Sequence, residues 1–150
     1  MKNDSYYMKI ALGEAEKALE MGEIPIGAVL VDKNGMVVSC GHNMREAWND
    51  ATAHAEIIVI REAGKKIGEW RLSGCTLYVT VEPCPMCAGA AVMARVARIV
   101  YGVPNSRDGG VESVFNIPGG LKINHQVEIR AGVLEDECIE IMQRFFSHRR

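Results

Sequence analysis

Three potential metal ligands and one nearby acid are the residues of this chain with the clearest capacity for chemistry. His54 and Glu56 are separated by one residue, and the later segment Glu82-Pro83-Cys84-Pro85-Met86-Cys87 contributes two thiols. One imidazole and two thiolates form a donor set that suits zinc. Three protein ligands leave the fourth tetrahedral position for water, which is typical of a catalytic zinc. The pattern predicts one zinc ion held by His54, Cys84 and Cys87.

Glu56 is not required as a ligand and is the predicted proton carrier. Zinc can lower the pKa of a bound water from about 16 to about 7. Two anionic ligands make the ion a weaker Lewis acid than three neutral imidazoles would, so a nearby base would help. A carboxylate can take the proton from water and pass it to a leaving group. We therefore predict that Glu56 is the general base and acid of a hydrolysis.

The pattern leaves an alternative open. Cys-x-x-Cys alone also occurs in redox pairs and in structural zinc sites, where a distant residue such as His42 or Cys75 would be the fourth ligand. His-x-Glu followed by Pro-Cys-x-x-Cys, however, resembles the signature of zinc nucleobase deaminases. The combination favours the catalytic interpretation.

The first half of the pattern requires a helix that begins at the histidine. Residues at i and i+2 do not share a face inside a helix. His54 and Glu56 can therefore converge on one metal only where regular helical geometry has not yet begun. Asp50 and Thr52, just upstream, are suitable helix-start residues.

The second half predicts another helix start. Pro83 and Pro85 suit the entrance to a helix, where N–H groups lack partners anyway. Cys84 and Cys87 are three apart and share a face. A helix N-terminus favours negative charge and lowers the pKa of a thiol. We expect the metal to lie between the N-termini of two helices.

Length and composition limit the class of protein. The chain has 150 residues, is 48% hydrophobic and 24% charged, and carries a net charge of −2. These values favour a single domain over residues 1–150 and exclude a general nucleic-acid binder, although a local basic patch for a specific RNA stays possible. Five cysteines without a secretory segment favour thiols and metal over disulfides. No apolar run is long enough to cross a membrane, so we expect a cytoplasmic protein.

Helical and strand patterns alternate after an initial hairpin. We expect helices over residues 5–20, 54–66, 85–96 and 134–146, strands over 25–31, 36–40, 75–81, 98–102 and 126–130, and a long loop over 103–124. This order predicts an α/β fold with three layers, α/β/α, around a central mixed five-stranded sheet. Ligands bind beyond the strand C-termini of such sheets, and both metal-bearing helices would begin there.

Two smaller predictions concern individual residues. Asp4 or Ser5 is the expected cap of the first helix. Cys40, Cys75 and Cys138 are expected to be small core residues.

Nearly the whole chain resembles the cytidine-deaminase-like superfamily, and within it the bacterial tRNA adenosine deaminases. The resemblance is carried by residues 23–31, by Thr52-Ala53-His54-Ala55-Glu56-Ile57, by 77–84, 86–90, 124–128 and 132–138, and by Phe145-Phe146 before a basic end. It implies the cytidine-deaminase-like fold, one zinc ion per subunit and a homodimer. It also implies that adenosine is converted to inosine at the wobble position of a tRNA anticodon loop.

The resemblance also assigns residues to the substrate. Asn43 would hydrogen-bond the flipped base, although a plain turn residue after a strand fits its position equally well. Backbone N–H groups near Ala55 and Cys84 would help to fix the base. Ile26 and Asn105 complete the predicted substrate-binding set.

Two regions bear on the substrate rather than on the zinc chemistry. Between residues 101 and 114 the chain departs from its relatives, with Asn105 where an acid is common and Glu112 where glycine is common. The resemblance places this loop near RNA. The basic end, with Arg144, His148, Arg149 and Arg150, is either a solvated tail or a set of phosphate contacts beside Phe145-Phe146.

Three functions follow from these residues. The first is hydrolytic deamination of an unpaired or flipped adenine in tRNA, with attack at C6 and loss of ammonia. The second is deamination of a free base or nucleoside, such as cytosine, guanine or a modified purine. The third is a non-catalytic zinc-binding or RNA-binding module, which would release no ammonia.

Overall fold

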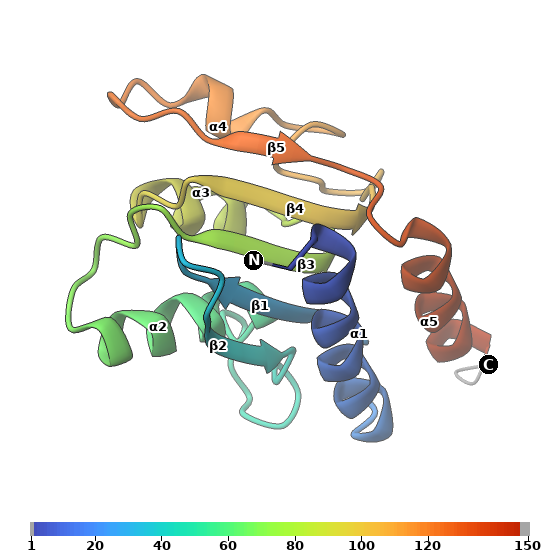
Figure 1. Cartoon of the computed structure of the whole chain (residues 1–150). Helices are drawn as coiled ribbons and strands as arrows, with labels where there is room; N and C mark the ends of the chain where they lie inside the picture. The colour runs from blue at the N-terminus through green and yellow to red at the C-terminus, as the bar shows by residue number, and fades with distance from the viewer. Residues whose placement is uncertain (1, 148–150) are drawn as a thin grey trace.

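A computed structural model describes residues 2–147 and contains one five-stranded sheet with helices on both faces (Figure 1). The helices are α1 (Asp4–Glu20), α2 (Ala55–Ile67), α3 (Pro85–Met93), α4 (Ile117–Gly120) and α5 (Glu135–Ser147). The strands are β1 (Gly27–Val31), β2 (Val37–His42), β3 (Thr76–Val81), β4 (Arg98–Val103) and β5 (Glu128–Arg130). None of these helices is long and apolar enough to cross a membrane.

The sheet is mixed, with the strand order β2-β1-β3-β4-β5. β1 pairs antiparallel with both β2 and β3, whereas β3, β4 and β5 run parallel. The hairpin between β1 and β2 closes at Asp32, whose carboxylate accepts hydrogen bonds from the N–H groups of Asn34 and Met36. Gly35 in this turn has a φ of 85°, which a residue without Cβ adopts at little cost.

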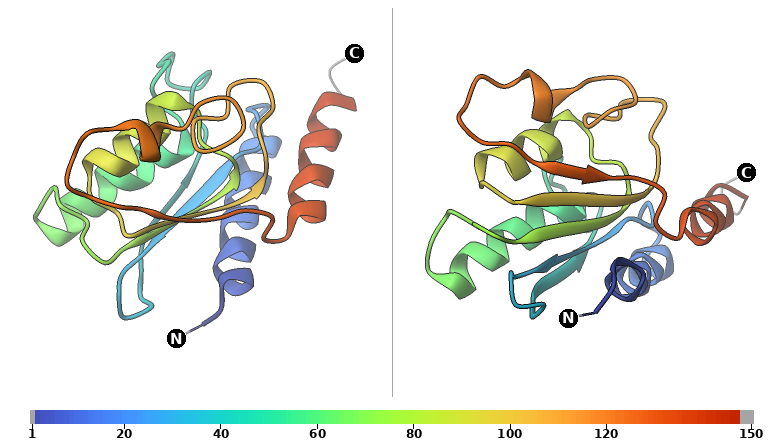
Figure 2. Two further views of the ribbon diagram at one scale, coloured as in Figure 1. Left: turned by 90° about the horizontal axis from the view of Figure 1, so that it is seen from above. Right: turned by 45° about the horizontal axis from the view of Figure 1, so that its top comes forward.

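The helices form two layers, as the view from above shows (Figure 2). α1 and α5 cover one face of the sheet, and their core includes Tyr7, Met8, Tyr78 and Cys138. α2 and α3 cover the other face over a core rich in alanine and valine. The predicted three-layer α/β/α fold with a mixed five-stranded sheet is confirmed.

Some boundaries and residues differ from the prediction. The cap of α1 is Asn3, whose side chain accepts a hydrogen bond from the Tyr6 N–H at 2.9 Å, and not Asp4 or Ser5. Asp4 is instead buried against arginines of β4 and β5, which no local rule reveals. Cys40 is exposed rather than part of the core, because β2 is the edge strand, where the side chain lies near Glu14 and Lys17 of α1.

Two helical segments also differ from the prediction. α3 ends at Met93, three residues earlier than expected, and Arg95 beyond it adopts a left-handed φ of 66°. The predicted loop over 103–124 contains the four-residue helix α4, capped by the Asn116 side chain.

One edge of the sheet brings distant segments together. β3 ends at Val81 and β4 ends beside it at Val103, because the two strands are parallel and in register there. The antiparallel β1 begins at the same edge, where the Gly27 N–H donates to the Thr80 hydroxyl at 3.2 Å. Residues that follow β3 and β4 and precede β1 therefore meet at this edge.

Candidate active site

The start of α2 places His54 and Glu56 beside each other. His54 is the N-cap residue and has extended backbone angles, φ −77° and ψ 152°. Its side chain makes no capping hydrogen bond, so the imidazole is available for another partner. This geometry allows residues at i and i+2 to converge, as the sequence predicts. Glu56 lies in the first turn and is only 4% exposed.

Burial determines the protonation of Glu56. Loss of water around the carboxylate raises its pKa to about 7, although its own backbone N–H and the nearby His54 act in the opposite direction. A carboxyl group with a pKa near neutrality can both accept and donate a proton at the pH of a cell.

The start of α3 supplies the two thiols. Cys84 is the N-cap, also extended and without a side-chain capping bond, and Pro85 is the first helical residue. The Ala88 N–H donates to the Cys84 carbonyl at 2.9 Å, so the helix begins directly at the first cysteine. Cys87 lies one turn later and is fully buried. Both helices thus direct their positive N-terminal ends toward the thiols, as predicted.

The distances between the donor atoms fit a tetrahedral zinc ion. His54 Nδ1 lies 3.6 Å from Cys84 Sγ and 3.5 Å from Cys87 Sγ. Zinc bonds of about 2.3 Å to sulfur and about 2.0 Å to nitrogen would separate tetrahedral N and S ligands by about 3.5 Å. All three donor atoms lie within 4.8 Å of one another. The residues therefore match zinc without rearrangement.

The environment favours a thiolate at this position. Hydrogen bonds from Cys87 and His54 lower the pKa of Cys84 to about 4, and the same contact with Cys84 raises the pKa of Cys87. The Cys84 thiol also raises the pKa of His54. Only deprotonated thiols and neutral imidazole bind zinc, so metal binding releases protons from this cluster.

The structure does not supply a fourth protein ligand among residues 2–147. The cluster of possible metal donors contains only His54, Cys84 and Cys87. His42 Nδ1 lies 2.9 Å from the Glu14 carboxylate on the α1 side of the sheet. Cys75 precedes β3, at the end of that strand opposite Cys84. Neither residue closes the site, and this geometry favours a catalytic zinc over a structural one.

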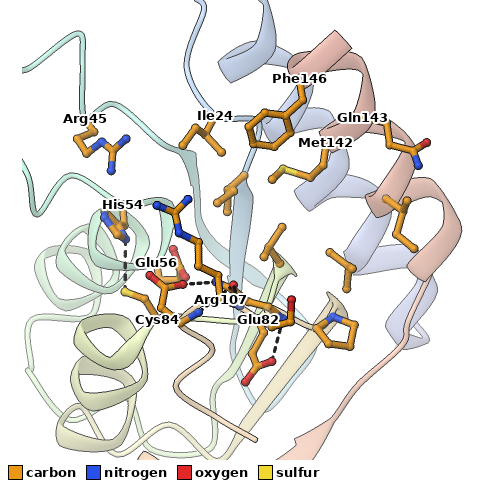
Figure 3. A pocket seen from close by; sticks show the side chains of 18 of the residues that line it. Ile24, Arg45, His54, Glu56, Glu82, Cys84, Arg107, Met142, Gln143 and Phe146 are labelled. Carbon is orange, nitrogen blue, oxygen red and sulfur yellow. Dashed lines mark hydrogen bonds between the residues drawn. The ribbon is translucent and has the colours of Figure 1, made fainter. Parts of the chain in front are cut away.

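A pocket of about 750 Å³ opens above the cluster (Figure 3). His54, Glu56 and Cys84 line it, and so does Ile26 just before β1. Its other walls come from residues 103–108 after β4 and from the face of α5 that carries Met142 and Phe146. The volume falls in the range of about 300–1,000 Å³ that is usual for small-molecule sites.

The four predicted substrate-binding residues lie in different surroundings, two at the pocket and two buried. Ile26 and Asn105 border the pocket. Ala55 is completely buried at the start of α2. Asn43 is 5% exposed, and its side chain accepts from the Arg45 N–H at 3.0 Å and donates to the Ile24 carbonyl at 3.5 Å. These local bonds favour the turn interpretation of Asn43, and all four assignments to the substrate stay predictions.

Some residues of the pocket were not predicted from the sequence. Arg45, Arg107 and Met142 line it, as labelled in Figure 3. Phe146, which the sequence analysis named beside the basic end, also lines it. Of the predicted basic end, Arg144 is paired with Glu16 at 2.8 Å, and His148, Arg149 and Arg150 lie outside the described residues.

Comparisons with known proteins agree with this geometry. Residues 1–103 match the family described as the cytidine and deoxycytidylate deaminase zinc-binding region. The tRNA-specific adenosine deaminase of Bacillus subtilis is 49% identical over all 150 residues, which cover 92% of that protein.

Two solved structures extend the comparison. One comes from a study of A-to-I editing by tRNA:A34 deaminases at the wobble position of transfer RNA. Its sequence is 44% identical to this chain and its TM-score is 0.87. The match covers 91% of this chain and 99% of that protein chain. A guanine deaminase from Bacillus subtilis is 30% identical, with a TM-score of 0.66 over 97% of this chain and 95% of its own. The chain therefore belongs to the zinc-binding deaminase family, in the branch that contains the bacterial tRNA-specific adenosine deaminases.

Proposed function

We propose that this protein hydrolyses adenosine to inosine at the wobble position of a tRNA anticodon. One observation carries the proposal: a buried Glu56 and a three-ligand zinc site lie together at the base of a pocket large enough for more than a free base. Relatives 44–49% identical, which are named for the same reaction, support it.

The chemistry divides between the metal and Glu56. Zinc held by His54, Cys84 and Cys87 would supply a water molecule of lowered pKa. The Glu56 carboxylate would accept a proton from the attacking water as the water oxygen bonds to C6 of adenine. The same carboxyl group then gives the proton to the exocyclic nitrogen, the C6–N bond breaks, and ammonia leaves. One water is consumed, and the products are inosine and ammonia.

The rim of the pocket supports a polynucleotide substrate. Arg45 and Arg107 border the opening, and residues 2–147 give neither guanidinium an ion pair. Phe146 adds an aromatic surface that is 56% exposed. Cations for phosphates and aromatic faces for unstacked bases are the groups that bind single-stranded RNA loops. The net charge of −2 indicates that phosphate contacts are local rather than spread over the whole surface.

A second candidate is the deamination of a free purine. The 30% identity to a guanine deaminase supports it, because the same zinc cluster would serve. The higher identity to the tRNA enzymes and the cationic rim favour the first proposal.

The test compares substrates for the zinc-loaded protein. We expect inosine from an anticodon stem-loop with adenosine at the wobble position, and no inosine from the same RNA when that adenosine is paired in a stem. Free adenosine, cytosine and guanine should release little ammonia. Turnover of guanine but not of the stem-loop would establish the second candidate, and the absence of ammonia from every substrate would establish a non-catalytic module.

Three further features belong to this proposal. Residues 1–150 act as a single deaminase domain, located with its tRNA substrate in the cytoplasm.

The protein acts as a homodimer. Exposed apolar side chains on α3 and on the segment that includes α4 support self-association: Met86, Met93, Val114, Phe115 and Leu121. Light scattering at micromolar concentration checks the dimer, and a monomer mass would refute it.

A further inference from the structure

We infer that Glu82 is a positioning residue that fixes the loop wall of the pocket relative to the metal ligand Cys84. Glu82 follows β3 directly and stands two residues before Cys84 in the chain. It is only 2% exposed, although it carries a carboxylate. A buried carboxylate needs several donors to stay charged, so its partners show what it does.

The Glu82 carboxylate accepts hydrogen bonds from one loop, residues 105–113. Oε1 accepts from the Asn105 N–H at 3.0 Å and from the Ser113 hydroxyl. Oε2 accepts from the N–H groups of Val111, Glu112 and Ser113 at 3.1, 2.8 and 3.0 Å. No arginine or lysine within residues 2–147 pairs with it. The carboxylate thus accepts the backbone hydrogen bonds that a neighbouring strand or helical turn would accept in a regular element.

These donors occupy both oxygens of the Glu82 carboxylate. In Figure 3 the carboxylate points away from Glu56. Its contacts are therefore those of a residue that holds a loop, and its role differs from that of Glu56.

Two glycines let the loop lie directly on the chain that carries the metal ligand. A Cβ at Gly109 would come within 2.6 Å of the Glu82 Oε2, and one at Gly110 within 2.7 Å of the Cys84 carbonyl carbon. The Gly110 N–H also donates to the Pro83 carbonyl at 2.7 Å. Because no side chain separates the loop from residues 82–84, a displacement of the loop moves Cys84. A displacement of Cys84 likewise moves the loop.

The anchored loop carries the substrate-facing wall. Residues 103–108 border the pocket, and Asn105 is held at its backbone by Glu82. The Asn105 side chain closes the next turn: it donates to the Asp108 carboxylate at 2.6 Å and accepts from the Arg107 N–H at 3.1 Å. Glu82 therefore sets, through this rigid turn, where Arg107 stands relative to the zinc cluster.

The test is Glu82→Gln, which keeps the shape but turns one acceptor into a donor that faces N–H groups. The activity readout rests on the proposed function. We expect the KM for the anticodon stem-loop to rise at least about tenfold with a smaller change in kcat, because the wall is displaced and the proton carrier is not. Zinc should stay at one ion per chain. Amide hydrogen exchange at Asn105 and 111–113 should accelerate about tenfold or more, since these N–H groups lose their acceptor.

Matched variants separate positioning from general damage. Ser113→Ala removes one donor and keeps the carboxylate, so KM should change less than about threefold. Glu82→Asp keeps the charge and should restore part of the exchange protection. Asp4→Asn removes another buried carboxylate, remote from the pocket, and should leave KM and the loop exchange unchanged.

Each outcome decides the inference. Unchanged exchange in the loop of Glu82→Gln overturns it, as does loss of zinc and of global structure in step with activity. If the wild-type protein does not act on the stem-loop, the proposed function fails separately, and the exchange and zinc measurements still decide whether Glu82 holds the loop.

Discussion

Three buried carboxylates show how the surroundings of a residue assign its role. Burial without a cation at hydrogen-bond distance raises the pKa of Glu56 to about 7. Backbone N–H groups lower the pKa of Glu82, and the Arg98 guanidinium holds the pKa of Asp4 far below its usual range. Of these three, Glu56 is the one with a pKa near neutral, which supports its proposed role as the proton carrier.

At the residue scale, Glu56→Gln should abolish most turnover. Glutamine keeps the shape of the side chain but cannot accept a proton, and general acid–base catalysis is worth about 10²–10⁴ in rate. We expect kcat on the stem-loop to fall by at least about 100-fold while one zinc per chain remains. Glu62→Gln, an exposed acid on the same helix α2, is the control and should be fully active. Turnover retained in Glu56→Gln would rule out its proton transfer.

At the scale of elements, helix starts supply the metal donors, whereas a loop and a helix face form the walls of the pocket. The N-caps and first turns of α2 and α3 supply the candidate metal ligands, where unpaired N–H groups favour negative charge. The segment after β4 and the outer face of α5 form the walls that a substrate would meet. Because these walls are held by side chains rather than by a ladder of backbone bonds, their sequence can vary more freely than that of the sheet.

Arg107 tests the role of the wall. Arg107→Ala should raise the KM for the stem-loop about tenfold and reduce the salt dependence of binding by the equivalent of about one phosphate contact. Arg144→Ala is the matched control, because Arg144 is paired with Glu16 and does not line the pocket. Binding and turnover measured at several salt concentrations check the prediction, and equal effects of the two changes would contradict it.

At the scale of the whole molecule, Asp4 joins the first helix to three strands. Its carboxylate accepts hydrogen bonds from Tyr78 of β3 at 2.6 Å, from Arg98 of β4 at 2.9 and 3.1 Å, and from Arg130 of β5 at 2.6 Å. β5 has only three residues and lies at the edge of the sheet. The Asp4 contacts therefore fasten a weak edge strand to the layer of α1.

Asp4→Asn should destabilise the protein in a pH-dependent way. A folded-state pKa below the unfolded value adds stability that is complete above about pH 5 and is lost as the pH falls toward the folded pKa. We expect a loss of about 1–3 kcal/mol at pH 7, because the arginine partners are partly exposed. The difference from wild type should shrink between about pH 5 and pH 2.

Urea denaturation across this pH range checks the prediction. Release of zinc in acid affects both proteins and cancels in the comparison. Glu16→Gln breaks an exposed pair with Arg144 and should change stability by less than about 0.5 kcal/mol, with no such trend. A constant difference between Asp4→Asn and wild type from pH 7 to pH 2 would show that the charge of Asp4 is not the source of its effect.

Short-range spacing was sufficient to predict that His54, Cys84 and Cys87 form one cluster of possible metal donors. The i, i+2 spacing of His54 and Glu56 and the i, i+3 spacing of Cys84 and Cys87 have one convergent solution, at helix starts, and the structure adopts it. The alternation of helices and strands likewise predicted the layers and the mixed sheet. These features follow from local geometry, which neighbouring residues specify by themselves.

The walls of the site and the buried charges depended on residues far apart in the chain. Glu82 meets a loop 23 to 31 residues away, and Asp4 meets Arg130 across 126 residues. Neither periodicity nor capping rules connect such pairs, because only the packing of strands β3, β4 and β5 and helix α1 brings them within hydrogen-bond distance. The sequence by itself determined the metal-donor cluster and the architecture. The tertiary structure alone decided which side chains line the pocket, since those contacts exist only once the sheet has assembled.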